Sequence, residues 1–315
     1  MPTLERLVAG PHSVVTVVSQ PDRPRGRGRK QTASPVARVA LDHGLALLRP
    51  ERVGASEVAE ALGSQAPDLG VVVAFGQFLP KRIREQPRLG YLLNAHASLL
   101  PRHRGAAPIA HAILAGDPRT GVCAMRVEKP MDAGAVCGVR ETPIGAEETA
   151  GDLSARLAGL AAELMADVVD RAAAGELARA DAWVAQDDSK ATLAPRIQRE
   201  DARLDFREPA AVLIRRVRAM APRPGAFTSW RGEPLRILAA RAEPGPATSP
   251  PGRVDRAADG AVRIATGDGW LVPTRLQRAG GRVLDVADFQ RGQGLEEATR
   301  LGDPKPTPGR APDLG

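Results

Sequence analysis

The chain has 315 residues, which is long enough for two domains that each bury a hydrophobic core. Its net charge of +7 and pI near 10.2 favour an anionic partner such as nucleic acid. No apolar run reaches the ~20 residues that cross a bilayer, and no signal-peptide pattern opens the chain. Cys123 and Cys137 are too few for a disulfide framework, so we expect buried free thiols in a cytosolic protein with no membrane contact.

The first 75 residues alternate between helical and strand-like patterns. Helices are expected over residues 2–9, 35–43 and 55–62, and strands over residues 14–18, 45–48 and 70–75. Alternation of this kind is typical of βαβ units, so it predicts an α/β domain with a Rossmann-like, doubly wound and mostly parallel sheet. The last of these strands is a continuous apolar run, as expected for a strand covered on both faces.

A basic stretch, QPDRPRGRGRK, spans residues 20–30 between the first strand and the second helix. Its five cations are Arg23, Arg25, Arg27, Arg29 and Lys30. Proline and glycine disfavour regular structure, so the sequence predicts an exposed loop whose guanidinium groups can fork onto phosphates. A solvated basic loop is the alternative. A phosphate-binding P-loop is a poorer match, because the Gly-Lys-Ser/Thr ending is missing.

A second candidate ligand-binding segment follows the strand at residues 70–75. Ligands in doubly wound sheets bind outside the carboxyl ends of strands, and Gly76 allows a sharp turn there. A plain strand-to-helix turn is the alternative interpretation of this segment. Its residues are Phe75, Gly76, Gln77, Phe78 and Leu79.

The segment LNAHASLLPRHRGAAP, residues 93–108, carries the candidate chemistry. Side chains alternate along an extended segment, so Asn94, His96 and Ser98 are expected on one face. An amide and an imidazole on one face can hold a carbonyl oxygen while it becomes an oxyanion. Asp132, in the loop of a hairpin predicted from strands at 122–127 and 136–139, is the candidate proton acceptor. Each residue also has a structural interpretation: a turn asparagine, a buried histidine, and an aspartate in a turn.

The second half of the chain begins with a helical pattern at residues 152–174 and a charged linker at 181–205. A short helix at 209–220 precedes five short strand-like runs separated by Gly, Pro and Asp, which predict a small β-barrel. Eight arginines against two glutamates between residues 207 and 241 suggest a phosphate-facing surface, or else a solvated face. We therefore expect domains at 1–180 and 206–302, a linker at 181–205, and a disordered tail at 303–315.

The string NAHASLLPRHRGAAPI, followed by GDPRTGV and MDAG, resembles the signature of the 10-formyltetrahydrofolate-dependent formyltransferases, in particular the branch that acts on methionyl-tRNA. The resemblance implies transfer of a formyl group from 10-formyltetrahydrofolate to methionyl initiator tRNA by a cytoplasmic, monomeric, metal-free enzyme. It implies that Asn94, His96 and Asp132 are catalytic. It assigns folate contacts to the loop 75–79 and to Ser98, Leu99, Leu100 and Pro101, and it makes the C-terminal barrel OB-like.

The resemblance also implies that the basic loop meets the acceptor end of the tRNA, because relatives acting on nucleotides or sugar nucleotides generally lack it. His103 stands where the family has an aromatic residue and receives no role. Relatives open with a strand and a Gly-Thr-Pro loop ahead of the first helix. We expect their loss, through a misassigned start codon or a real truncation, to leave the sheet with unpaired edges. Two alternatives stay open: a formyltransferase with a nucleotide or amino-sugar acceptor, and an inactive tRNA-binding protein.

Overall fold

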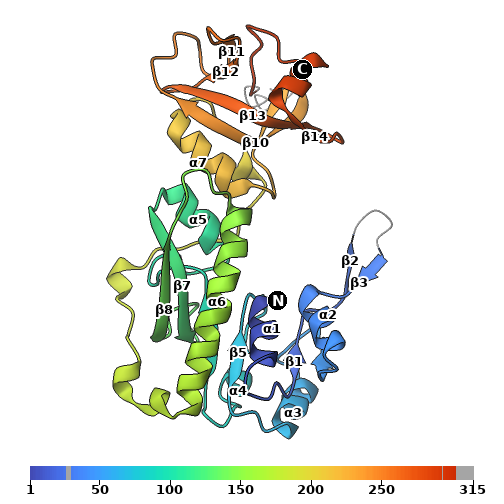
Figure 1. Ribbon diagram of the computed structural model, residues 1–315, viewed down its shortest axis with the longest axis vertical. Helices are drawn as coiled ribbons and strands as arrows, with labels where there is room; N and C mark the ends of the chain where they lie inside the picture. Colours follow the sequence, from blue (N-terminus) through green and yellow to red (C-terminus); the bar gives the residue numbers. More distant parts are fainter. Residues whose placement is uncertain (26–29, 293, 303–315) are drawn as a thin grey trace, which may run out of the picture. The chain divides into compact units, whose positions relative to one another are not determined.

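The computed structural model describes residues 1–25, 30–292 and 294–302, and the chain forms two compact units (Figure 1). Unit 1 comprises residues 1–108, 118–144 and 154–195, and unit 2 comprises residues 109–117, 145–153 and 196–315. The predicted tail from residue 303 lies outside the described residues. In the described part of the chain, no helix is both long and apolar enough to span a membrane.

The first part of unit 1 contains the predicted alternation of helices and strands. Its elements are α1 (Pro2–Val8), β1 (Val17–Val18), α2 (Pro35–Asp42), β4 (Leu47–Leu48), α3 (Ser56–Ser64), β5 (Gly70–Val72) and α4 (Lys81–Arg84). The start of α2 follows from its sequence: Pro35 occupies the first turn, and the Ser34 hydroxyl accepts a hydrogen bond from the Ala37 amide at 3.0 Å. The helices and strands alternate as the sequence predicts, although the strands are shorter.

A four-stranded sheet forms the second part of unit 1. It contains β5, β6 (Leu92–His96), β7 (Arg119–Arg126) and β8 (Val136–Pro143), in that order. β5 and β6 are parallel, whereas β6–β7 and β7–β8 are antiparallel. Helix α6 (Ala150–Ala173) lies against β8, where a Cβ added to Gly138 would lie 3.0 Å from both Leu164 and Val168. The two cysteines are buried in β7 and β8 as free thiols, and burial raises the pKa of each to about 11.

The strands β1-β4 and β5-β6-β7-β8 of unit 1 form separate sheets, with an interruption between β1 and β5. Among the described residues β1 pairs with β4 alone, and β5 pairs with β6 alone. The two pieces share one apolar cluster built on Val53, Val58, Ile83 and Leu92, onto which Val18 and Val72 pack. Packing therefore joins the two pieces while the backbone edges facing the interruption stay without a strand partner in the described part.

The basic stretch contains regular structure that the sequence analysis did not predict. Arg23–Arg25 (β2) and Lys30–Thr32 (β3) form a short antiparallel hairpin, with Arg25 paired to Lys30. The prediction that proline and glycine exclude regular structure here is wrong, because each strand needs only three residues of pairing. Residues 26–29, which include Arg27 and Arg29, lie outside the described residues.

Unit 2 is built on a curled antiparallel sheet, in agreement with the predicted OB-like barrel. Its strands are β9 (Phe227–Trp230), β10 (Glu233–Glu243), β11 (Val254–Arg256), β12 (Val262–Ala265), β13 (Trp270–Arg278) and β14 (Val283–Asp285). The order is β11-β12-β13-β10-β9, and β14 pairs with β13. Helices α5 (Pro108–Ala115), α7 (Ala210–Met220) and α8 (Val286–Arg291) complete the described helices of this part (Figure 1).

The interruption of the sheet predicts uneven protection of backbone amides in β1. The amides of Val17 and Ser19 donate to carbonyls of Ala46 and Leu48 at 2.8 and 2.9 Å. Successive amides of a strand point to opposite edges, so the Val18 amide faces the interruption. Hydrogen exchange followed by NMR should find Val18 exchanging much faster than Val17 and Ser19. Equal protection of the three amides would show that the edge is covered.

Candidate functional site

Strand β6 places Asn94 and His96 on one face, two residues apart, as the sequence predicts. β6 lies between β5 and β7, with Asn94 opposite Val72 on one side and Met125 on the other. The Asn94 side chain is half-buried, and its amide makes no hydrogen bond with any of the described residues. A side-chain donor in the middle of an inner strand, without a partner in the described part of the chain, is available to a substrate oxygen.

The imidazole of His96 is buried and lies between two oxygen atoms. Nε2 donates to the carbonyl oxygen of His103 at 2.9 Å, which fixes a proton on Nε2 because a carbonyl can only accept. Nδ1 lies 3.6 Å from Oδ2 of Asp132. This separation exceeds a hydrogen bond, so Nδ1 is not committed to Asp132 and can turn toward a substrate oxygen or a bridging water.

Asp132 lies in the loop between β7 and β8, where the sequence predicts it, and its side chain is 16% exposed. Oδ2 accepts a hydrogen bond from the Gly105 amide at 2.9 Å. Asp132 has a φ of 51° and His103 a φ of 59°, so both partners of His96 adopt the left-handed conformation that non-glycine residues rarely take. The surrounding contacts must hold both of these backbones in place.

Those contacts come from residues that the sequence analysis missed. The strap, which we define as residues 186–194, pairs with the loop 101–107 through Arg104 and Leu193. Thr192 Oγ1 accepts from the His103 amide at 2.9 Å, and the Ala194 amide donates to the Arg104 carbonyl at 2.7 Å. The strap falls in the predicted linker, whose scattered charges have neither helical nor strand periodicity, so no sequence pattern could have identified it.

Within the strap, Gln186 reaches directly to the loop of Asp132. Its Nε2 donates to the carbonyl oxygens of Asp132 and Gly134, both at 2.8 Å. Its Oε1 accepts from Nε of Arg104 at 2.9 Å. The described residues contain no cluster of three or more His, Cys, Asp or Glu side chains that could hold a metal. The contacts of Gln186 described above link the Asp132 loop to Arg104.

The loop after β5 is positioned beside the Asn94 segment, because Val72 and Asn94 are register partners in parallel strands. Two glutamines hold this loop. Gln20 Nε2 donates to the Phe75 carbonyl at 2.6 Å. Gln77 accepts from the Val53 amide at 2.8 Å and donates to the Pro50 carbonyl at 3.2 Å. Gln77 is thus engaged within the protein, and its role toward a ligand stays a prediction.

The remaining residues of this loop divide into a buried and an exposed set. Phe75 and Leu79 pack against the apolar cluster of unit 1, whereas the Phe78 side chain is 71% exposed. Gly76 has a φ of 78°, the left-handed conformation that the predicted turn requires. An exposed aromatic ring in the loop that follows β5 is suited to a flat heterocycle.

The segment from Ser98 to Pro101 closes the turn that follows β6. Ser98 is fully buried, and its hydroxyl donates to the Arg102 carbonyl at 2.6 Å. Leu99 lies over β7, where a Cβ added to Gly121 would come within 2.7 Å of it. Leu100 and Pro101 are half-buried. These contacts give the segment a structural role, and its contact with a ligand stays a prediction.

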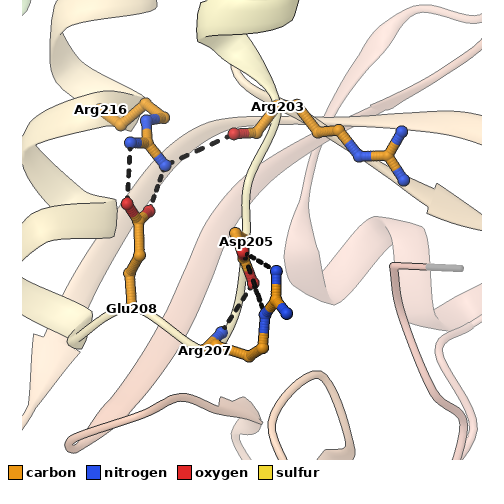
Figure 2. Close-up of polar contacts among 5 residues, drawn as sticks. All are labelled: Arg203, Asp205, Arg207, Glu208 and Arg216. Carbon is orange, nitrogen blue, oxygen red and sulfur yellow. Dashed lines mark hydrogen bonds and ion pairs between the residues drawn. The ribbon is translucent and has the colours of Figure 1, made fainter. Parts of the chain in front are cut away.

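The sequence suggests a phosphate-facing surface on the arginines of unit 2. Several of these arginines bind carboxylates or carbonyls of the same unit. Figure 2 shows Arg216 bound to both oxygens of Glu208 and Arg207 bound to Asp205. Arg207 lowers the pKa of the Asp205 carboxyl to about 2. Arg218 donates to the carbonyl oxygens of Glu148 and Gly145 at 2.9 and 2.7 Å. The side chains of α7 therefore tie this unit together, and a phosphate-facing surface on this unit stays a prediction.

Comparison with known proteins identifies the class to which this fold and site belong. The chain matches the formyl transferase family over residues 3–169 and the formyl transferase C-terminal domain over residues 196–294. The first match covers more than half of the chain and includes the whole of β6 and the Asp132 loop. The chain belongs to the formyl transferase family.

Among its relatives are methionyl-tRNA formyltransferases. That of Halorhodospira halophila is 45% identical over 94% of this chain and 93% of the relative, and that of Solibacter usitatus is 41% identical over 96% and 95%. The solved structure of WlaRD, a sugar 3N-formyl transferase, is 14% identical, has a TM-score of 0.62, and covers 89% of this chain and 94% of its own. At that identity the likeness to WlaRD concerns the fold alone.

The site geometry predicts that Gly105 tolerates no side chain. Its φ is 128°, and a Cβ would lie 2.6 Å from the Ala194 carbonyl of the strap. Gly105→Ala must therefore displace the amide that binds Asp132, and we expect formyl transfer to fall roughly 10- to 100-fold. Gly90→Ala is the matched control, because Gly90 has a φ of 75° with nothing within 4 Å. Steady-state kinetics would contradict the account if both variants kept full activity.

Proposed function

We propose that this chain transfers the formyl group of 10-formyltetrahydrofolate to the α-amino group of methionyl initiator tRNA. The observation that carries the proposal is the constellation at the end of β6: an unpartnered Asn94 amide beside a His96 ring that faces the Asp132 carboxylate at 3.6 Å. It occurs in a chain that belongs to the formyl transferase family, and the methionyl-tRNA formyltransferases named above match it over nearly its full length.

The proposed chemistry needs one oxyanion site and one proton acceptor. The folate cosubstrate supplies the formyl carbon, and the methionyl amine forms a new C–N bond to it while the bond to the folate nitrogen breaks. The Asn94 amide donates to the formyl oxygen as it becomes negative, and Nδ1 of His96 does so when the ring carries a second proton. Asp132 accepts the proton that the amine loses, directly or through water, and holds His96 in orientation; a proton is returned to the folate nitrogen as its bond to the formyl carbon breaks. Much of the acceleration comes from holding both substrates in place.

The folate is assigned to the space between the two segments that leave the carboxyl ends of β5 and β6. Phe75 to Leu79 form one wall, with the exposed ring of Phe78 available to the pterin, and Ser98 to Pro101 form the other. The fit is supported by the Asn94 amide, a free donor at the mouth of this space.

The tRNA is assigned to the basic hairpin. Arg23, on β2, is 64% exposed and lies 3.9 Å from Glu51, a weak surface pair that leaves it available to phosphate. Arg25, Arg27, Arg29 and Lys30 continue the same run.

The proposal also includes a monomeric state, a cytoplasmic location and a division of the chain into domains at 1–180 and 206–302 with a linker at 181–205. A nucleotide or amino-sugar acceptor is the alternative that this hairpin makes less favourable.

The proposed proton acceptor predicts the effect of Asp132→Asn. The amide keeps the shape of the side chain and loses its charge and basicity, so transfer should fall roughly 100- to 10,000-fold. Binding of charged initiator tRNA should stay unchanged. Asp68→Asn, an exposed position in a surface pair with Arg88, is the matched control. Radiolabelled formyl transfer and a filter-binding assay measure both quantities, and unchanged turnover would remove Asp132 from the mechanism.

The proposed tRNA site predicts that the positive charge of the hairpin affects the KM for tRNA and not the KM for folate. Replacing Arg25, Arg27, Arg29 and Lys30 by alanine should raise the KM for tRNA and weaken its dependence on salt, with the KM for folate unchanged. The control neutralises an equal number of cations, Lys81, Arg82, Arg84 and Arg88, elsewhere on unit 1. Transfer to an amino-sugar nucleotide, tested in parallel, should be absent. An unchanged KM for tRNA would contradict the assignment.

A further inference from the structure

The loop that carries Asp132 is strained and needs a support from outside its own hairpin. Asp132 has a φ of 51°, and Gly134 lies so close to the Arg126 carbonyl that an added Cβ would be 2.0 Å from it. The base of the loop is closed by the Arg126 amide, which donates to the Ala135 carbonyl at 2.9 Å, whereas its tip has a weak turn contact from the Ala133 amide to the Pro130 carbonyl at 3.4 Å. Such a backbone stays in one conformation only when neighbouring groups fix it.

Gln186 provides such a support at two points. Its two N–H groups donate to the carbonyl oxygens on either side of Ala133, those of Asp132 and Gly134, at 2.8 Å each. Both donors of the amide are thereby used, and both carbonyl directions are fixed. Because the carbonyl and the side chain of Asp132 share one Cα, fixing the peptide also restricts where the carboxylate can point.

The orientation of the Gln186 amide is itself determined by its neighbours. Nε of Arg104 donates to Oε1 of Gln186 at 2.9 Å, so the amide nitrogen must face the loop. The Arg104 side chain is 11% exposed and also binds Asp188 at 2.7 Å. The strap is anchored just before Gln186, where the amides and carbonyls of Val184 and Val136 pair at 2.8 and 2.9 Å.

We propose that Gln186 is a positioning residue for the transfer reaction, acting through Asp132. The inference rests on the catalytic role assigned to Asp132 above. The Gln186 amide holds the Asp132 peptide so that Oδ2 receives the Gly105 amide and faces Nδ1 of His96. Without it the loop relaxes away from the left-handed conformation and the proton acceptor moves out of line with the amine.

Three substitutions separate this role from simpler ones. Gln186→Met keeps the length and volume and removes both donors. Gln186→Glu keeps the acceptor for Arg104 and directs an oxygen at the two carbonyls. Asp188→Ala removes the outer partner of Arg104 and leaves Gln186 intact. Gln65→Met is the matched control. Gln65 is exposed, follows α3, and lies far from the Asp132 loop in the sequence.

We expect Gln186→Met and Gln186→Glu to lower kcat roughly 10- to 100-fold, because small displacements of a catalytic group have effects of that size. The KM values for folate and tRNA should stay within about twofold, as should all constants of Asp188→Ala and Gln65→Met. Thermal unfolding of each variant reports whether the fold is kept. Full activity of Gln186→Glu would overturn the proposal, since it would show that the bond to Arg104 is what matters.

A double-mutant cycle tests whether Gln186 acts through Asp132. The single-turnover rate of the double variant, Gln186→Met with Asp132→Asn, should be less than about twofold below that of Asp132→Asn alone. The reason is that the group being positioned is already disabled in Asp132→Asn. If the fold reduction in rate of the double variant equals the product of the two single reductions, Gln186 has an independent role and the inference is overturned. If Asp132→Asn is inactive while Gln186→Met is fully active, this inference alone fails. If Asp132→Asn is fully active, the proposed mechanism fails with it.

Discussion

The imidazole of His96, held between the His103 carbonyl and the Asp132 carboxylate, is the arrangement on which the site depends. The carbonyl fixes a proton on Nε2 at 2.9 Å, and the carboxylate faces the other nitrogen at 3.6 Å. Both partners have positive φ, a conformation that costs free energy for residues with a Cβ. The strap offsets that cost with two hydrogen bonds: Thr192 accepts one from the His103 amide, and Gln186 donates one to the Asp132 carbonyl. A segment whose regular structure is limited to one short 3₁₀ turn, Asp188–Lys190, thus contributes to the geometry of the proposed catalytic group.

The fold brings the other parts of the site to this histidine. β5 and β6 are parallel neighbours, so the segments that leave their carboxyl ends lie side by side and can enclose one ligand. β6 and β7 are antiparallel, which turns the chain back so that the loop after β7 presents Asp132 to the face of β6 that carries His96. The loop after β7 starts beside the amino end of β6, where Arg126 pairs with Leu93, and its Asp132 carboxylate nevertheless reaches to 3.6 Å from Nδ1 of His96.

Much of this was predictable, and the failures have physical causes. The helices and strands of unit 1 follow from hydrophobic periodicity, and Asn94, His96 and Asp132 from alternation, a hairpin pattern and family resemblance. The short hairpin at Arg23–Arg25 was missed because three residues of pairing leave no periodic signal in a Gly- and Arg-rich run. Gln186 was missed because a single polar contact across 54 positions has no local signature. The contacts of the α7 arginines were not predictable, because charge counts do not reveal which cations already bind carbonyls or carboxylates, as Arg216 and Arg218 do.

The central claim is that His96 is held in one tautomer by the His103 carbonyl, and ¹⁵N NMR of the imidazoles tests it most directly. The chain has five histidines, and His96→Gln would assign the resonances of His96. We predict a neutral ring with a protonated, hydrogen-bonded Nε2. A neutral ring protonated at Nδ1, or two nitrogens that exchange their protons freely with water, would contradict the account.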